Sequence, residues 1–139
     1  MHDQDTVIPY TDHRRLRSLL NQPLPARDGP RAPQFGPLRQ RIRNSRVVNP
    51  KDVPRNVVTM NSRLVLRNLD SGESITCTLA YPQELDLLRQ QVSVASPLGA
   101  NMLGKRVGQI VHWPAGAKVR RLRIQQVLYQ PEAAGDYHL

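Results

Sequence analysis

Apolar residues in the first part of the chain recur at helical spacing. Leu16, Leu19 and Leu20 follow the i, i+3, i+4 pattern of one buried helical face. Thr11 precedes them as a candidate N-cap, and Asp12 would sit at the positive end of the helix dipole. The pattern therefore predicts a first short helix that begins at Asp12 and ends at Leu20.

A second short helix is predicted to begin near Pro37, with Leu38 and Ile42 as its apolar positions and Phe35 packing at its entrance. The intervening residues 21–36 are rich in Pro and Gly, which predicts a loop. Isolated helices of about ten residues are marginal in water, so the two are expected to pair as an antiparallel hairpin. The second arm also has a basic face, interpreted either as a solvated surface or as a partner-binding surface, formed by Arg39, Arg43 and Arg46.

From Val57 onward the apolar pattern changes to short alternating runs. Residues 63–67 and 74–79 are two such runs, joined through Asp70-Ser-Gly72. Because Gly72 supplies the positive φ that a tight turn requires, this segment predicts a β-hairpin. The remaining predicted elements are strands over residues 92–95, 109–113 and 118–130, a turn at Pro114-Ala-Gly116, and a helix over 98–103 that Gly104 ends.

The predicted fold class is α+β with two parts. Residues 1–53 are expected to form a short, Pro-rich, basic helical hairpin that is antiparallel. Residues 54–139 are expected to form a bent antiparallel sheet with one short helix around a single core. One break in the alternation of the last strand indicates a bulge or a bend.

The net charge indicates which kinds of partner the protein could attract but does not identify one. The net charge is +9, with ten basic against five acidic residues in 1–53 and ten against six in 54–139. A field of this sign attracts polyanions, although the six aromatic residues do not interleave with the arginines as in many nucleic-acid-binding surfaces. The lone Cys77, the polar N-terminus and the lack of a long apolar run lead us to expect a cytoplasmic protein.

Candidate catalytic patterns are weak. Gly99-Ala-Asn-Met-Leu-Gly-Lys105 resembles a phosphate-binding loop, but Arg106 stands where such a loop needs a hydroxyl to hold magnesium. The four histidines are scattered without other ligands at metal-binding spacing, and Cys77 has no local basic environment. We therefore expect no metal, no cofactor and no enzymatic activity.

Three segments carry a family resemblance: Val57-Val-Thr-Met-Asn-Ser62, Ser93-Val-Ala-Ser-Pro-Leu-Gly99 and Tyr129-Gln-Pro-Glu-Ala-Ala-Gly-Asp-Tyr-His-Leu139. They resemble the regulator of nucleoside diphosphate kinase family, which is related to the Gre transcript-elongation factors that bind RNA polymerase at its secondary channel. The resemblance implies that the second part has an FK506-binding-protein-like fold. It also implies docking on RNA polymerase through the loop before the helix, here Val94, Ala95, Ser96, Pro97 and Leu98.

Compared with Gre factors that stimulate transcript cleavage, the hairpin lacks an acidic tip. The loop offers Asp28 between Arg27 and Arg31, and no acidic residue occurs from Gly29 through Lys51. A divalent ion needs clustered oxygen ligands, which this tip does not supply. An arm of about ten helical residues also rises only about 15 Å. Where relatives typically carry acidic residues, the second arm has Arg39, Arg41 and Arg43.

The leading interpretation is a non-catalytic transcription regulator that occupies a site on RNA polymerase and competes with Gre factors. We expect it to be a monomer. One alternative is a peptidyl-prolyl isomerase-like enzyme, which would need a pocket lined by Tyr81, Trp113, Tyr129 or Tyr137. Another is a basic nucleic-acid-binding protein, whose affinity would fall steeply with salt.

Overall fold

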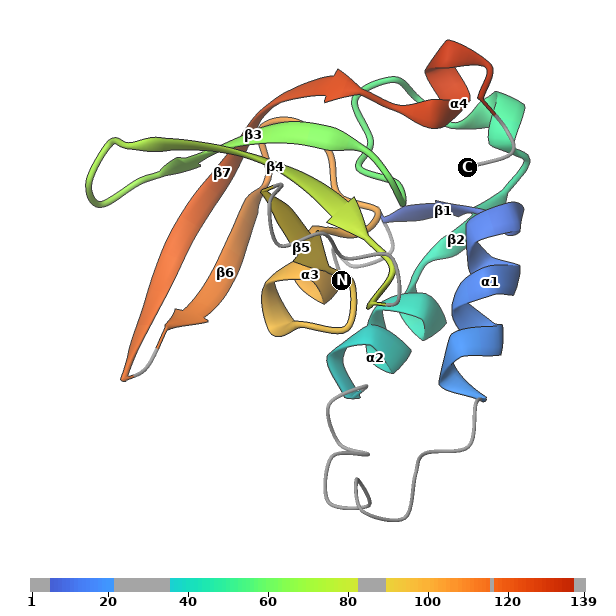
Figure 1. Cartoon of the computed structure of the whole chain (residues 1–139), viewed down its shortest axis with the longest axis horizontal. Coiled ribbons are helices and arrows are strands. Elements are labelled where there is room, and N and C mark those ends of the chain that lie inside the picture. Colours follow the sequence, from blue (N-terminus) through green and yellow to red (C-terminus); the bar gives the residue numbers. More distant parts are fainter. Residues whose placement is uncertain (1–5, 22–35, 83–89, 116, 137–139) are drawn as a thin grey trace.

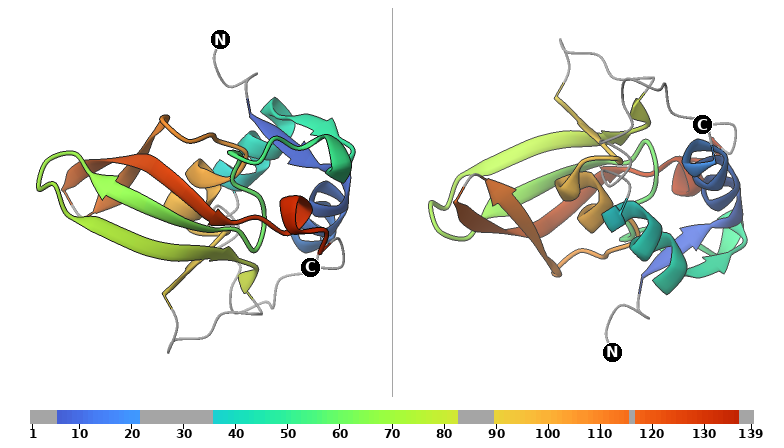
Figure 2. Two further views of the ribbon diagram at one scale, coloured as in Figure 1. Left: turned by 90° about the horizontal axis from the view of Figure 1, so that it is seen from above. Right: turned by 90° about the horizontal axis from the view of Figure 1, so that it is seen from below.

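The computed structural model describes residues 6–21, 36–82, 90–115 and 117–136, and the structural statements below concern these residues. The strands of the main sheet extend to one side of the molecule, whereas α1, β1, β2 and α4 gather at the other end (Figure 1, Figure 2). In chain order the elements are β1 (Val7–Pro9), α1 (Tyr10–Leu20), α2 (Gly36–Asn44), β2 (Arg46–Val48), the 3-10 helix η3 (Pro50–Asp52), β3 (Arg63–Asn68), β4 (Ser74–Ala80), β5 (Gln91–Ser93), α3 (Pro97–Met102), β6 (Ile110–Ala115), β7 (Lys118–Tyr129) and α4 (Pro131–Ala134).

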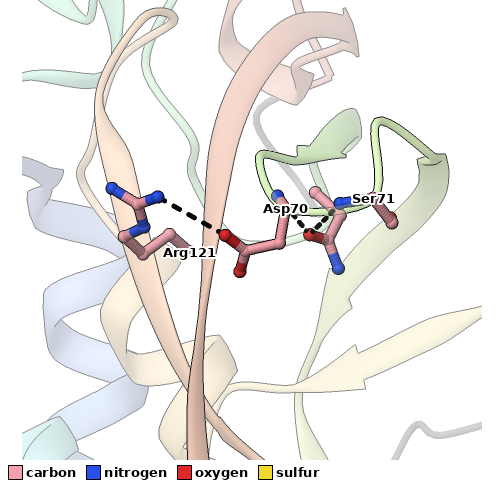
Figure 3. A network of polar contacts seen from close by, with 4 residues as sticks. Asp70, Ser71 and Arg121 are labelled. Atoms are coloured by element: carbon pink, nitrogen blue, oxygen red, sulfur yellow. Dashed lines mark hydrogen bonds and ion pairs between the residues drawn. The ribbon is translucent and has the colours of Figure 1, made fainter.

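Five strands form a curled sheet in the order β5-β4-β3-β7-β6. The predicted hairpin is confirmed as β3 and β4, with Gly72 at φ 79° in the turn. The Asn68 side chain accepts hydrogen bonds from the backbone N–H groups of Asp70 and Ser71, at 2.8 and 3.2 Å. Figure 3 shows this turn beside Arg121 of β7, whose guanidinium lies 3.4 Å from the Asp70 carboxylate.

The prediction of an entirely antiparallel sheet is wrong at one edge. β3 pairs antiparallel with β4 and β7, and β6 pairs antiparallel with β7, but β5 runs parallel to β4. Parallel neighbours need a connection long enough to return the chain to the other end of the sheet, and β5 begins at Gln91, well after the end of β4 at Ala80. Strand alternation along the sequence reports that a strand exists but not its direction.

The last strand is more irregular than its sequence pattern indicates. One break was predicted, but the pairing of β7 with β3 shifts twice, at Leu128 and at Gln125. Each extra residue bends the strand and increases its twist, which curls the sheet around α3. The predicted turn begins too early, because Pro114 and Ala115 still pair with β7.

The first helix begins earlier than predicted. α1 starts at Tyr10 with Pro9 as N-cap, and no side chain caps it, so the assignment of Thr11 as the cap is wrong. The reason is that β1 runs straight into the helix, and the proline ring holds φ near the −62° that it adopts here. The two predicted helices run in opposite directions (Figure 1), and β1 and β2 beside them form a small parallel sheet that was not predicted.

One apolar core runs through both ends of the molecule. The apolar faces of α1 and α2 pack against the sheet and α3 as well as against each other. Leu16 and Leu38 are completely buried in the same cluster as Leu64 and Met102. The division at residue 54 stays a prediction, and so does the FK506-binding-protein-like description of the second part. Large, fully buried side chains of this core come from β1, α1, α2, β3, β4, α3, β7 and two loops: Ile8, Leu16, Leu38, Met60, Leu64, Leu66, Leu79, Met102, Leu103, Leu122 and Ile124.

Candidate functional site

The loop between β5 and α3, residues 94–98, is held in one shape by a serine-centred network. The Ser93 carbonyl accepts from both the N–H and the hydroxyl of Ser96, at 3.0 and 2.7 Å. The Ser96 hydroxyl in turn accepts from Gly99 N–H at 3.1 Å and so caps α3. The predicted helix is confirmed, one residue earlier, because Ser96 and Pro97 supply the N-cap and N1 residues.

Close approach explains the glycine of this segment. A Cβ on Gly99 would lie 2.0 Å from the Ser93 carbonyl oxygen and 2.9 Å from the Val94 Cα. These are backbone atoms, so they cannot move aside as a flexible side chain would. The loop therefore has its shape only with glycine at this position.

The five residues predicted to dock on a partner divide into two groups. Val94 and Leu98 are buried in the core and have no free surface to offer. Ala95 and Ser96 are half-buried and Pro97 is exposed, so these three form the accessible part of the segment. Docking through this segment stays a prediction, and in this structure Ala95, Ser96 and Pro97 would carry it.

A second candidate site is the groove between α1 and α2, which we call the interhelical groove. Its volume is about 480 Å³. Two members of the predicted basic face, Arg39 and Arg43, line it together with Arg17 of α1, whereas Arg46 lies outside it, exposed on β2. The described residues that line it are His13, Arg17, Leu20, Asn21, Arg39, Ile42, Arg43, Ser45 and Val47. The predicted hairpin tip, Arg27, Asp28 and Arg31, lies outside the described residues, as does Phe35.

Neighbouring arginines of α2 have different roles. Arg39 and Arg43 are exposed, and the Arg39 guanidinium donates to the Leu20 carbonyl at 3.1 Å. Arg41 points the other way, is only 9% exposed, and donates from Nε to the Ala100 carbonyl of α3 at 3.2 Å. Arg41 therefore joins the second arm to the helix that follows the docking loop, a role that sequence reasoning missed.

Two buried carboxylates, Asp12 of α1 and Glu132 of α4, bind adjacent residues of the segment before β3. Asp12 is completely buried and accepts a hydrogen bond at 3.0 Å from the Met60 N–H, while its Oδ1 has no partner among the described residues. Glu132 is 7% exposed and accepts at 2.6 Å from the Thr59 hydroxyl. Burial and the Glu132 charge raise the pKa of Asp12 to about 7, against the opposing effects of the Met60 N–H and Arg15.

Hydrogen bonds hold the first and the last of the three resemblance segments together. Thr59 and Ser62 of the first segment share a hydrogen bond at 2.9 Å, and Thr59 binds Glu132 of the last. The Gln130 amide donates to the carbonyls of Pro54 and Val57, at 2.7 and 2.8 Å. Sequence reasoning used these residues as family markers, but no local pattern indicated that they contact one another.

Groups that were considered for chemistry do not gather. Within the described part of the chain, no three His, Cys, Asp or Glu residues are placed to hold a metal ion. Burial raises the pKa of the Cys77 thiol to about 11, which disfavours the thiolate. His112 is exposed on β6, and Tyr81 is part of the core.

Comparisons with known proteins place the chain in a family. A family model described as "Transcription elongation factor, GreA/GreB, C-term" matches residues 53–129. The chain is 40% identical, over 138 residues and 96% of both chains, to the "Regulator of nucleoside diphosphate kinase" of Escherichia coli (strain K12). The chain belongs to the regulator of nucleoside diphosphate kinase family, and it contains a GreA/GreB C-terminal region. The predicted resemblance is confirmed, and the region of the GreA/GreB model begins just after η3.

More distant relatives match about half of the chain or share its fold. The chain is 38% identical to the "Transcription elongation factor GreA" of Thermotoga petrophila over 71 residues, which is 51% of this chain and 46% of that protein. Among solved structures, "Prokaryotic transcription elongation factor GreA/GreB from Nitrosomonas europaea" superposes with a TM-score of 0.70 at 33% identity, covering 90% of this chain and 98% of that one. The chain thus has a GreA/GreB-like fold.

The relatives' names describe regulators and elongation factors rather than enzymes. Among the described residues, α1 is the longest helix at 11 residues, and no helix is long and apolar enough to cross a membrane.

Proposed function

We propose that this protein is a transcription regulator that docks on RNA polymerase near its secondary channel and acts by occupying that site. The observation that carries the proposal is the combination of a GreA/GreB-type C-terminal region with a short basic helical pair packed on the same core. Docking uses Ala95, Ser96 and Pro97, and the helical pair lies beside the docked region. The effect is competition with Gre factors, without bond chemistry.

Rigidity of the docking loop supports this assignment. The serine network and the close approach at Gly99 leave Pro97 displayed at the start of α3 without further ordering on binding. A surface that is ordered beforehand loses less entropy when a partner binds. Arg41 extends this rigid unit to α2, so a partner that holds the loop also determines where the helical pair lies.

Lack of cleavage activity follows from charge and length. No acidic residue occurs from Gly29 through Lys51, so this stretch supplies no ligands for a catalytic divalent ion. The helices of 11 and 9 residues rise about 1.5 Å per residue, which gives each arm roughly 15 Å of helix. The protein is therefore expected to compete with cleavage factors but not to replace them.

Binding to purified core RNA polymerase tests the proposal directly. We expect the protein to bind, to be displaced by a Gre factor, and to lose about tenfold in affinity when Pro97→Glu places a charge on the docking loop. Glutamate is compatible with the first position of a helix, so the fold of α3 should be kept. Gln126→Glu on β7 is the matched control, since it adds the same charge at another exposed position.

Two results would contradict the proposal. One is equal binding of the Pro97→Glu variant and the wild-type protein, which would remove the loop from the interface. The other is metal-dependent shortening of nascent RNA in a stalled complex by this protein alone. Point variants are preferable to deletion of residues 1–53, because deletion would remove Ile8, Leu16 and Leu38 from the shared core.

A further inference from the structure

The interhelical groove combines an apolar floor with a cationic rim. Leu20, Ile42 and Val47 contribute aliphatic surface, and Val47 is 45% exposed. Arg17 and Arg43 project from opposite walls and are both exposed. A groove of about 480 Å³ has room for one or a few side chains of a binding partner, but not for a folded element.

The cationic rim is not neutralised by the described part of the chain. None of the described residues that line the groove carries a carboxylate, and none of Arg17, Arg39 and Arg43 forms an ion pair with a described carboxylate. Arg39 and Arg43 are separated by four positions on α2, a spacing at which like charges repel across one helical turn. Burial and the Arg17 charge also lower the pKa of His13 in the same groove. The free protein thus holds several positive groups close together, and an anionic partner would relieve their repulsion.

The floor distinguishes between kinds of anion. Single-stranded nucleic acids bind by stacking bases on aromatic rings, and none of the described residues that line this groove is aromatic. Tyr10 belongs to a neighbouring hollow, where the Arg14 guanidinium lies 5.8 Å from its ring centroid. Carboxylates pair with arginine through two parallel hydrogen bonds, and an aliphatic side chain between them would fill the floor.

We propose that the interhelical groove binds an acidic peptide segment that carries an apolar anchor residue. The carboxylates lie against Arg17, Arg39 and Arg43, and the anchor covers Leu20, Ile42 and Val47. The Arg39 guanidinium is already held by the Leu20 carbonyl, so part of the rim is ordered before binding. This inference goes beyond the proposed function and does not depend on it, because the groove can bind such a segment whether or not the protein docks on RNA polymerase.

Fluorescence anisotropy with the full-length protein and three labelled peptides tests the inference. The first peptide has Glu residues around a central Leu pair, the second replaces Glu by Gln, and the third replaces Leu by Ser. We expect the Glu and Leu peptide to bind at least about tenfold more tightly than either of the others. If the Ser peptide binds as tightly as the Glu and Leu peptide, the role of the apolar anchor is refuted. If the Gln peptide binds as tightly as the Glu and Leu peptide, the role of the cationic rim is refuted.

Protein variants locate the binding to the groove. Arg17→Gln with Arg43→Gln is expected to reduce affinity for the Glu and Leu peptide by about tenfold. The matched control is Arg120→Gln with Arg123→Gln, which removes the same charge from exposed positions of β7 and is expected to change affinity by less than about twofold. Val47→Ser should weaken binding of the two peptides that contain Leu and leave binding of the Ser peptide unchanged.

Two outcomes would refute the assignment. Equal losses in the groove variant and the β7 variant would mean that only the overall charge attracts the peptide. Tighter binding of an oligothymidylate, with loss of that binding in the groove variant, would mean that the groove is a nucleic-acid surface instead. All four arginines are exposed, so the variants are expected to keep the fold, which circular dichroism checks.

Discussion

The β3–β4 hairpin is stabilised by residues that are close in sequence, whereas α1 and α2 are held by side chains that reach across the molecule. In the β-hairpin, the strand register, the Gly72 turn and the Asn68 side chain all lie between residues 63 and 80. In the helical pair, Asp12 binds Met60 and Arg41 binds Ala100, across 48 and 59 positions of sequence.

This difference has a physical consequence. A hairpin with many local backbone hydrogen bonds tolerates the loss of any one exposed side-chain contact. A helix joined to the domain by a few buried polar contacts is sensitive to each of them, because a buried polar group left unpaired destabilises the fold. The position of α1 and α2, and hence the shape of the interhelical groove, should therefore respond to single substitutions and to pH.

The largest expected effect is a dependence of stability on pH through Asp12. Its pKa is raised from 3.8 to about 7 by burial and by Glu132, so the folded state holds the proton more tightly than the unfolded state. The stabilisation is complete below the unfolded value of 3.8 and is lost as pH rises through about 7. A shift of this size corresponds to roughly 4 kcal/mol between the two limits.

Asp12→Asn isolates this contribution. The amide oxygen can still accept from Met60 N–H, and the charge is absent, so the variant should be more stable than the wild type above about pH 7. Urea unfolding of both proteins between about pH 4 and pH 8 measures the difference. Asp52→Asn is the control because Asp52 is exposed on η3. Parallel pH profiles for wild type and Asp12→Asn would show that Asp12 is not the group responsible.

The next largest effect is expected at the docking loop. Gly99→Ala places a Cβ 2.0 Å from the Ser93 carbonyl oxygen, so the backbone must shift, and we expect a loss of about 3 kcal/mol in the free energy of unfolding. Gly36→Ala is the matched control, because no atom lies within 4 Å of its added Cβ. Chemical denaturation of both variants measures the contrast, and similar stability for the two would refute the close approach at Gly99.

A smaller effect is expected where α2 meets α3. Arg41→Met leaves the Ala100 carbonyl without the Nε donor in a buried setting, and we expect a loss of about 2 kcal/mol. Arg39→Met removes a similar hydrogen bond to the Leu20 carbonyl at an exposed position, so its cost should be below about 0.5 kcal/mol. Thermal unfolding of the two variants compares the contacts, and a larger loss for Arg39→Met would reverse the assigned roles.

The smallest effect is expected at the tip of the sheet. Arg121 and Asp70 form an ion pair at 3.4 Å, with side chains that are 55% and 56% exposed (Figure 3). Exposed pairs contribute little, so Arg121→Met should change stability by less than about 0.5 kcal/mol. A loss comparable to that of Arg41→Met would contradict the proposed contrast between local and long-range stabilisation.

Local patterns in the sequence were sufficient for most elements. The spacing of Leu16 and Leu19 predicted α1, and the alternation on both sides of Gly72 predicted the β-hairpin. The cap and the direction of a strand were less predictable. Thr11 has the right chemistry for a cap, but Pro9 leads the chain into the helix from β1. β5 has an ordinary strand pattern, and only its neighbour determines that it runs parallel.

The candidate sites were predictable only in part. Arg39 and Arg43 were identified as a basic face, whereas Arg17, Leu20 and Val47, which complete the interhelical groove, come from other elements. The docking segment was identified as five residues, of which Val94 and Leu98 are buried. Distinguishing surface from core within a loop requires the elements that pack against it.

The sequence by itself determined most of the secondary structure, because apolar periodicity and turn residues act between neighbours along the chain. Tertiary structure alone decided that Asp12 and Glu132 lie close enough for their charges to interact, that Arg41 turns inward while Arg39 and Arg43 stay exposed, and that a groove opens between α1 and α2. The physical reason is that burial, pKa shifts and hydrogen bonds between distant residues depend on how the elements pack, and packing is a property of the whole core rather than of any segment.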